Sequence, residues 1–126
     1  MNRILVIDDD EQIREMLQHM LEQAGYEVAV ASDGKEGLRH MNDQIPDLVM
    51  TDIVMPEKDG IETILDIRKN FPDTKIIAMS GGGRISQDDY LKMAMGLGAV
   101  RTFVKPVSRV KLLEAVNELL TSERKG

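Results

Sequence analysis

The sequence predicts an α/β fold in which a parallel sheet is covered by helices on both faces. Five short apolar runs alternate strictly with five segments of helical periodicity. Right-handed crossovers between parallel strands deposit the helices on the two faces of such a sheet. The length of 126 residues fits one domain with a single core. We therefore expect one doubly wound, five-stranded α/β domain.

The five expected strands are short and apolar, which is typical of strands buried in a parallel sheet. In chain order they cover residues 4–7, 27–31, 48–50, 76–79 and 102–104. The second of these alternates Val28 and Val30 with smaller or polar residues, a pattern that favours an edge strand.

The expected helices follow these strands at about 13–24, 33–41, 61–70, 88–97 and 112–120. Gly25 stands where a glycine commonly ends a helix, and Asp33 with Glu36 forms a D-x-x-E start signal. Pro72 closes the third helix, because proline cannot continue one. The last segment carries leucines at helical spacing and predicts an amphipathic helix.

The composition excludes several functional classes. The net charge of −6 and the pI of about 4.9 argue against direct nucleic-acid binding, which needs Lys and Arg to neutralise phosphates. The absence of Cys excludes disulfides and thiolate metal sites. No apolar segment is long enough for a signal peptide or a membrane span. We expect a cytoplasmic protein without a membrane partner.

Polar side chains follow four of the apolar runs. Ligands of open parallel sheets bind beyond the carboxyl ends of the strands, so residues at these ends are the candidates for a site. A single Asp in such a place is more often a helix cap than a ligand. Here, however, one sheet edge would gather carboxylates, a hydroxyl and an ammonium group. These residues are Asp8, Asp9, Asp10, Asp52, Ser80 and Lys105.

This assortment indicates phosphoryl chemistry. Two carboxylates about 4 Å apart repel by roughly 4 kcal/mol at an effective dielectric constant near 20. A proton, the Lys105 ammonium group or a divalent cation could offset that cost. Mg²⁺ prefers carboxylate oxygens, waters and phosphate, while Lys and hydroxyl groups bind phosphate oxygens. The residues therefore suit phosphoryl transfer to a carboxylate.

The chain resembles the receiver domain of two-component response regulators over essentially its whole length. The matching motifs are ILVIDDD (4–10), LVMTDIVMPEKDG (48–60), IIAMS (76–80), GA (98–99) and FVKP (103–106). The resemblance implies a flavodoxin-like (βα)5 fold with strand order 2-1-3-4-5, similar to stand-alone chemotaxis receivers. It places the receiver at 1–122 and a short tail at 123–126, with no effector domain.

The resemblance also implies a role for each site residue. Asp52 would accept the phosphoryl group, and Ser80 and Lys105 would contact it after transfer. The cation, Mg²⁺ or Mn²⁺, would be held by Asp8, Asp9, Asp52 and the backbone carbonyl of Val54. The donor would be a sensor histidine kinase or a phosphotransfer protein, and the output would be binding to a downstream protein. The chain would promote its own phosphorylation and dephosphorylation without turning over a separate substrate.

Several features lie outside this pattern. Thr102 occupies the position where the family usually has an aromatic switch residue, and Phe103, one residue later, is expected in the core. The segment Gly81–Gly83 is unusually rich in glycine and predicts a flexible loop. The Lys105–Pro106 peptide bond is expected to be cis by resemblance. Asp10 is expected to cap the first helix.

Two alternatives remain open at this point. A haloacid-dehalogenase-like Mg²⁺-dependent phosphatase would use Asp8 as its nucleophile, although Gln12 stands where that motif usually has Thr or Val. A small flavin-binding protein could share the sheet topology, but Tyr26 and Tyr90 are the only tyrosines and there is no Trp to stack on a flavin.

Overall fold

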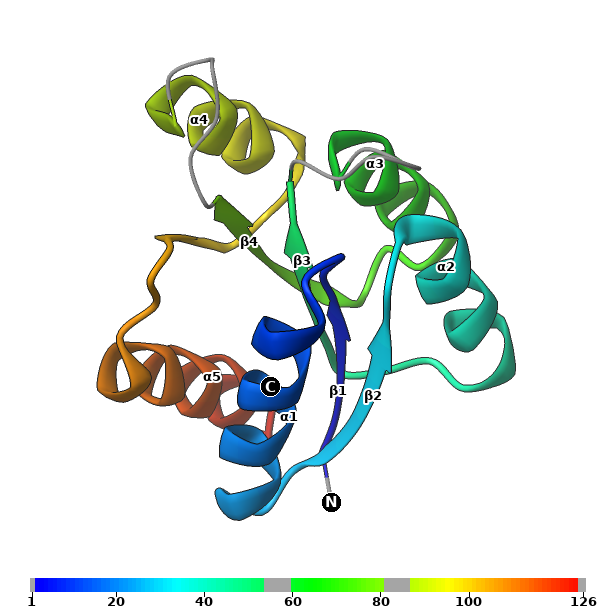
Figure 1. Ribbon diagram of the computed structural model, residues 1–126. Helices are drawn as coiled ribbons and strands as arrows, with labels where there is room; N and C mark the ends of the chain where they lie inside the picture. The colour runs from blue at the N-terminus through cyan, green and yellow to red at the C-terminus, as the bar shows by residue number, and fades with distance from the viewer. Residues whose placement is uncertain (1, 54–59, 81–86, 125–126) are drawn as a thin grey trace.

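The computed structural model describes residues 2–53, 60–80 and 87–124, and within them five strands alternate with five helices (Figure 1). The strands are β1 (Arg3–Ile7), β2 (Glu27–Ala31), β3 (Leu48–Asp52), β4 (Lys75–Ser80) and β5 (Arg101–Val104). The helices are α1 (Glu11–Gln23), α2 (Gly34–Asp43), α3 (Gly60–Asn70), α4 (Gln87–Leu97) and α5 (Arg109–Arg124). The alternation predicted from the apolar runs is confirmed. None of the helices in these ranges combines the length and the apolar character that crossing a bilayer requires.

All five strands are parallel and lie in the order β2-β1-β3-β4-β5, as the resemblance implies. The register aligns the carboxyl ends of neighbouring strands. Ile7 pairs with Thr51, Asp52 pairs with Met79, and Ser80 pairs with Val104. The residues that end these strands therefore gather at one edge of the sheet.

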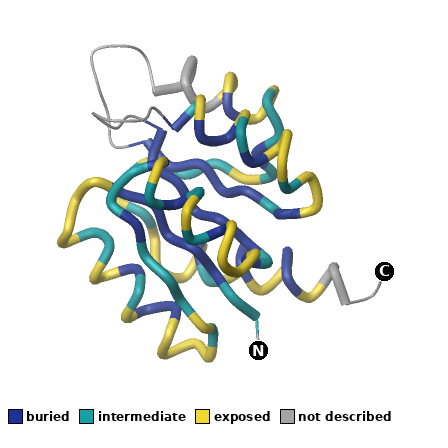
Figure 2. The backbone as a smooth tube through the Cα atoms, turned by 90° about the vertical axis from the view of Figure 1, so that its right-hand side faces the viewer, coloured by how far each residue is buried: buried dark blue, intermediate teal, exposed yellow. Residues whose placement is uncertain are grey.

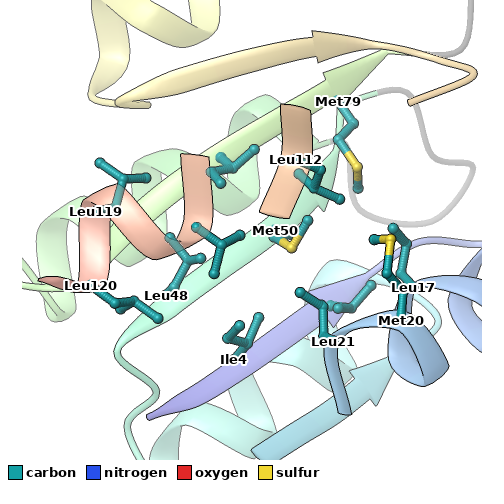
Figure 3. Packing of buried hydrophobic residues seen from close by; sticks show 13 residues of the cluster. Ile4, Leu17, Met20, Leu21, Leu48, Met50, Met79, Leu112, Leu119 and Leu120 are labelled. Carbon is teal, nitrogen blue, oxygen red and sulfur yellow. The ribbon is translucent and has the colours of Figure 1, made fainter. Parts of the chain in front are cut away.

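The two faces of the sheet carry separate apolar clusters instead of the single core that the chain length suggests, because successive side chains of a strand point to opposite faces. Helices α1 and α5 cover one face, and α2, α3 and α4 cover the other (Figure 1). Figure 2 shows the buried residues concentrated in the central strands and the exposed ones on the outer sides of the helices. Figure 3 shows the first cluster, which includes Ile4, Leu48 and Met50 of the sheet and Leu17, Leu21, Leu112, Leu119 and Leu120 of the helices.

Helix α1 has the caps that the sequence predicts, although its first residue is Glu11 and not Ile13. The Asp10 carboxylate accepts hydrogen bonds from the backbone N–H groups of Gln12 and Ile13, at 2.9 and 3.3 Å, so Asp10 is the expected N-cap. Gly25 follows the C-cap residue and has a φ of 99°, a conformation that other residues rarely adopt. Substituting such an N-cap by Ala typically costs about 1 kcal/mol.

The start of α2 differs slightly from the usual capping box. The Asp33 carboxylate accepts from the Glu36 backbone N–H at 2.9 Å, as the D-x-x-E signal predicts. The Glu36 carboxylate, however, accepts from the Ser32 hydroxyl at 2.8 Å and from the Ser32 backbone N–H at 3.4 Å. The return bond thus reaches one residue further back than in the standard motif.

Two helices are longer than the sequence patterns indicate. Helix α2 runs two residues past the predicted end at Met41, to Asp43. Helix α5 reaches Arg124, so the first residues of the expected tail 123–126 are helical. Apolar periodicity marks only the part of a helix that packs on the sheet, so it does not define where a helix ends. The Gly81–Gly83 loop lies outside the described residues.

Helix α3 begins in direct contact with the backbone of β3. The Gly60 N–H donates to the Ile53 carbonyl oxygen at 2.8 Å. A Cβ atom at Gly60 would lie 2.2 Å from the Asp52 carbonyl oxygen and 2.5 Å from the Ile53 Cα. Both neighbours are backbone atoms, so no change of rotamer could make room. Glycine is therefore required here by the close approach.

We expect Gly60→Ala to lower the free energy of unfolding by about 1–3 kcal/mol or more, as overpacking at a rigid contact does. Urea unfolding checks this value. Gly96→Ala is the matched control, because a Cβ at this exposed position in α4 meets nothing within 4 Å. The control should unfold at the same or a slightly higher urea concentration. Equal midpoints for Gly60→Ala and the wild type would contradict the steric explanation.

We also expect Ser32→Ala to raise the pKa of Glu36. The hydrogen bond from the Ser32 hydroxyl is the largest cause that lowers this pKa, and burial opposes it. A lowered carboxyl pKa stabilises the fold above the unfolded pKa, and that stabilisation is lost as pH falls through the folded pKa. The variant should therefore lose stability at neutral pH but not in strong acid. A ¹³C NMR titration of Glu36 measures the shift, with Ser108→Ala as a control at another helix start.

Candidate acidic site at the sheet edge

Residues from three strand ends meet at the Lys105 ammonium group. Its Nζ lies 2.7 Å from Asp8 Oδ2 and 3.1 Å from Asp52 Oδ2. Asp8 follows β1, Asp52 ends β3, and Lys105 follows β5. The side chains are largely shielded from solvent, with exposed fractions of 0% for Asp8, 7% for Asp52 and 13% for Lys105. The structure thus brings together three of the residues that the strand-end pattern predicts.

Asp9 completes a group of three carboxylates. One oxygen each of Asp8, Asp9 and Asp52 lies within 4.8 Å of the others, while the Asp9 side chain is on the exposed side of the group. Oxygen ligands at such spacing suit a hard divalent cation that keeps several of its waters. The residues present therefore fit the metal that the sequence chemistry predicts, and the open side at Asp9 leaves room for water or a phosphoryl group.

Ser80 lies at the same edge. It ends β4 and is buried, and its carbonyl oxygen accepts a hydrogen bond of 2.8 Å from the Lys105 backbone N–H. This bond extends the β4–β5 pairing by one residue, so the position of Lys105 is fixed relative to Ser80. The Lys105–Pro106 peptide bond is cis, as the resemblance implies. The strand ends that carry Asp8, Asp52, Ser80 and Lys105 therefore lie at one edge of the sheet.

The charges at the site hold Lys105 in its protonated form. Burial alone would lower the pKa of its ammonium group. The hydrogen bond with Asp8 and the negative charges of Asp52 and Asp8 outweigh burial, so the pKa of Lys105 is raised above its ordinary value. Removing one partner of such a buried pair leaves an uncompensated charge, which typically lowers the free energy of unfolding by about 3–5 kcal/mol.

Asp8 is held on every side. Its N–H donates to the Ala31 carbonyl at 3.1 Å, and its Oδ1 accepts from the Asp10 N–H at 2.9 Å. Its own carbonyl accepts from the Arg14 guanidinium at 2.7 Å. Arg14 was not identified from the sequence, because an Arg one turn into a helix has no apolar or strand-end signal. Its place one turn beyond the N-cap Asp10 is the single hint.

The structure separates the faces of Thr102 and Phe103. Phe103 packs against the cluster under α1 and α5, which confirms the predicted core role. Thr102 pairs with Ala78 and, being the preceding residue of the strand, points to the opposite face. The position where the family has an aromatic ring is therefore half-buried on the side of α4. Val54, whose carbonyl is a predicted metal ligand, lies outside the described residues.

A groove opens beside the carboxylates. It has a volume of about 600 Å³ and runs between α1 and the segment after β5. Its lining is mostly apolar and consists of Asp9, Asp10, Ile13, Met16, Leu17, Lys105, Pro106 and Val107. The groove therefore offers a partner an apolar surface that ends at the charged site.

Known proteins share both the sequence and the fold. The family model for the response regulator receiver domain matches residues 4–117. The chemotaxis protein CheY of Thermotoga maritima is 38% identical over 118 residues, which make up 93% of this chain and 96% of that protein. The transcriptional regulatory protein PhoP of Bacillus subtilis, which is named for alkaline phosphatase synthesis, is 34% identical. Its alignment covers 98% of this chain but only 56% of the regulator.

Solved structures agree with these relatives. A CheY-like receiver domain protein from Methanospirillum hungatei superposes with a TM-score of 0.90 and 31% identity, over 100% of this chain and 99% of that one. A receiver domain protein from Clostridium thermocellum gives 0.90 and 33% over 98% of both chains. Neither the phosphatase nor the flavin-binding alternative finds support among these matches. The chain belongs to the response regulator receiver domain family of two-component phosphorelay signalling.

Proposed function

We propose that Asp52 is the residue that accepts the phosphoryl group. The observation that supports this most is the shared Lys105, whose ammonium group bridges Asp52 and Asp8 at 3.1 and 2.7 Å. Asp8 is the poorer nucleophile, because its Oδ1 is bound to the Asp10 N–H and its side chain is fully buried. Asp52 ends its strand and retains a small exposed area. Attack by an Asp52 oxygen forms the new P–O bond as the donor's P–N bond breaks.

A divalent cation, Mg²⁺ or Mn²⁺, would be held by Asp8, Asp9 and Asp52. The spacing of their oxygens within 4.8 Å supports this set. The Val54 carbonyl would be a further ligand, as the family resemblance implies. When bound, the cation neutralises charge on the phosphoryl oxygens and orients them. The bound cation would reduce the repulsion among all three carboxylates. Of these three, Lys105 alone pairs only with Asp8 and Asp52.

Lys105 and Ser80 respond to the product. The phosphorylated Asp52 presents new negative oxygens, and the Lys105 ammonium group, kept protonated by its raised pKa, pairs with one of them. The Ser80 hydroxyl donates to another. Because the Lys105 N–H is bonded to the Ser80 carbonyl, a shift of either residue moves the ends of β4 and β5 together. Hydrolysis of the phosphoaspartate by water resets the site, so the chain acts on itself.

The donor would be a sensor histidine kinase or a phosphotransfer protein. Asp52 retains little exposed surface, so the donor's phosphoryl group must approach it at the edge of the sheet. The apolar groove beside Lys105 supports a protein donor, since it offers buried contact area directly at the reacting carboxylate.

The output would be a change in a protein-binding surface made by α4, β5 and α5. These elements expose large apolar side chains that a solitary domain would not need: Met93 (51%), Met95 (49%), Val104 (44%) and Val110 (65%). Val104 pairs with Ser80 across β4 and β5, so this surface adjoins the residue that responds to phosphorylation. A two-state surface of this kind is biased by the local event at Asp52.

Incubation with acetyl phosphate and Mg²⁺ should add one phosphoryl group to the chain, as measured by intact mass. The adduct should be absent in Asp52→Asn, because that variant lacks the nucleophile, and absent when EDTA removes the cation. Asp47→Asn, which changes an acidic residue at the opposite end of the sheet, is the control that should still acquire the adduct. A peptide map that placed the group on Asp8 or Asp9 would contradict the proposal.

Ser80→Ala should acquire the adduct but lose much of the response. In ¹H–¹⁵N NMR spectra of the wild type, phosphorylation should shift the amide signals of α4, β5 and α5. In the variant the same signals should shift much less, because the hydroxyl group that would donate a hydrogen bond to the phosphoryl oxygen is missing. Thr121→Ala, which removes an exposed hydroxyl on α5, should leave the response intact. A full response in Ser80→Ala would show that Ser80 has no part in the switch.

A further inference from the structure

Arg14 makes a side-chain hydrogen bond to the backbone of the acidic group. It lies on α1, is half-buried, and its Nη1 donates to the Asp8 backbone carbonyl oxygen at 2.7 Å. Asp8 stands directly after β1, so its carbonyl lies beyond the last pair of residues in the sheet register. The guanidinium therefore supplies a strong hydrogen bond where the sheet no longer does.

The carbonyl of Asp8 belongs to the peptide group that carries Asp9. A peptide group is planar, so fixing the direction of its C=O also fixes the direction of the following N–H and Cα. The Asp9 side chain is exposed, and none of the described residues holds its carboxylate by a hydrogen bond. The place of that carboxylate is consequently set by the backbone. Arg14 is the side chain that binds the carbonyl of this peptide group.

The two cationic side chains at the site have different partners. Lys105 binds carboxylate oxygens directly, and so competes with any ligand for them. Arg14 binds a backbone oxygen and leaves the carboxylate oxygens available. On the other side of Asp9, the Asp10 N–H is tied to Asp8 Oδ1 and the Asp10 carbonyl accepts from the Arg14 N–H at 3.0 Å. The three-residue turn is thereby held at both ends.

We propose that Arg14 is a positioning residue of the cation site. It fixes the Asp8–Asp9 peptide group so that the Asp9 carboxylate converges with those of Asp8 and Asp52. This inference rests on the proposed cation site. Residues that orient metal ligands typically contribute 10–100-fold to metal affinity, although they do not touch the metal.

The change in Mg²⁺ affinity on removing Arg14 distinguishes a positioning role from a simple charge effect, because the two roles predict changes of opposite sign. A positive charge near the site repels a divalent cation, so charge removal alone would strengthen Mg²⁺ binding. Loss of positioning would weaken it. We expect Arg14→Met, which keeps a long unbranched side chain without a donor, to raise the Mg²⁺ dissociation constant about 10-fold or more. NMR titration of the purified, unphosphorylated protein with Mg²⁺ measures this constant. Arg39→Met removes an exposed positive charge on α2 and should change it little.

A second measurement needs no cation. In metal-free protein, the ¹⁵N order parameter of the Asp9 amide should fall from about 0.85 toward 0.6 in Arg14→Met, since the peptide group is released. If the wild type binds no Mg²⁺, the proposed cation site is wrong, while this order parameter still reports whether Arg14 holds the turn. An unchanged order parameter would overturn the inference.

Arg14→Lys keeps the charge but replaces the planar guanidinium group by a single ammonium nitrogen. It should retain more Mg²⁺ affinity than Arg14→Met, and any loss should be matched by a lower order parameter of the Asp9 amide. If Arg14→Met does not fold, the same two measurements are made on Arg14→Lys alone. Tighter or unchanged Mg²⁺ binding in Arg14→Met, or a loosened Asp9 amide in Arg14→Lys with no loss of affinity, would contradict the proposal.

Discussion

The repulsion among the carboxylates at the end of the central strands is the constraint on which the rest of the structure depends. Asp8 is fully buried, and an isolated charge there would be very costly. Its compensating partner, Lys105, comes from 97 residues further along the chain and from the opposite part of the sheet. The Lys105 ammonium group therefore reaches the carboxylates only when β3, β4 and β5 are in place. Completion of the sheet and neutralisation of the site are one event.

Much of the fold follows from local patterns in the sequence. The alternation of apolar runs and helical segments predicts every element, and the Asp10 and Gly25 signals place both ends of α1 correctly. The strand-end rule also gathers Asp8, Asp52 and Lys105, because parallel strands end at one edge. These predictions succeed since each depends on a residue and its near neighbours. The strand order came from the family resemblance, because periodicity alone does not distinguish permutations of five strands.

Other features could not be predicted, because they depend on three-dimensional proximity with no sequence signature. The Arg14 side chain reaches back over one helical turn to a carbonyl, and many arginines on a first turn would not. The Glu36 carboxylate turns to Ser32 and not to the residue that the usual capping pattern names. The extent of α5 beyond its last apolar residues leaves no mark in the apolar periodicity. For Arg14 and Glu36, a flexible side chain could bind several partners, and the three-dimensional packing determines which one it binds.

The two apolar clusters, on opposite faces of the sheet, have a consequence for how this chain tolerates change. Ile4 and Val6 pack on one face while Leu5 and Ile7 pack on the other, so neighbouring residues of β1 belong to different cores. A cavity created on one face cannot be filled by a larger side chain on the other, because the strand backbones lie between them. Suppressors of a core substitution must therefore arise on the same face. The two apolar clusters of this small domain therefore accept or reject substitutions independently of each other.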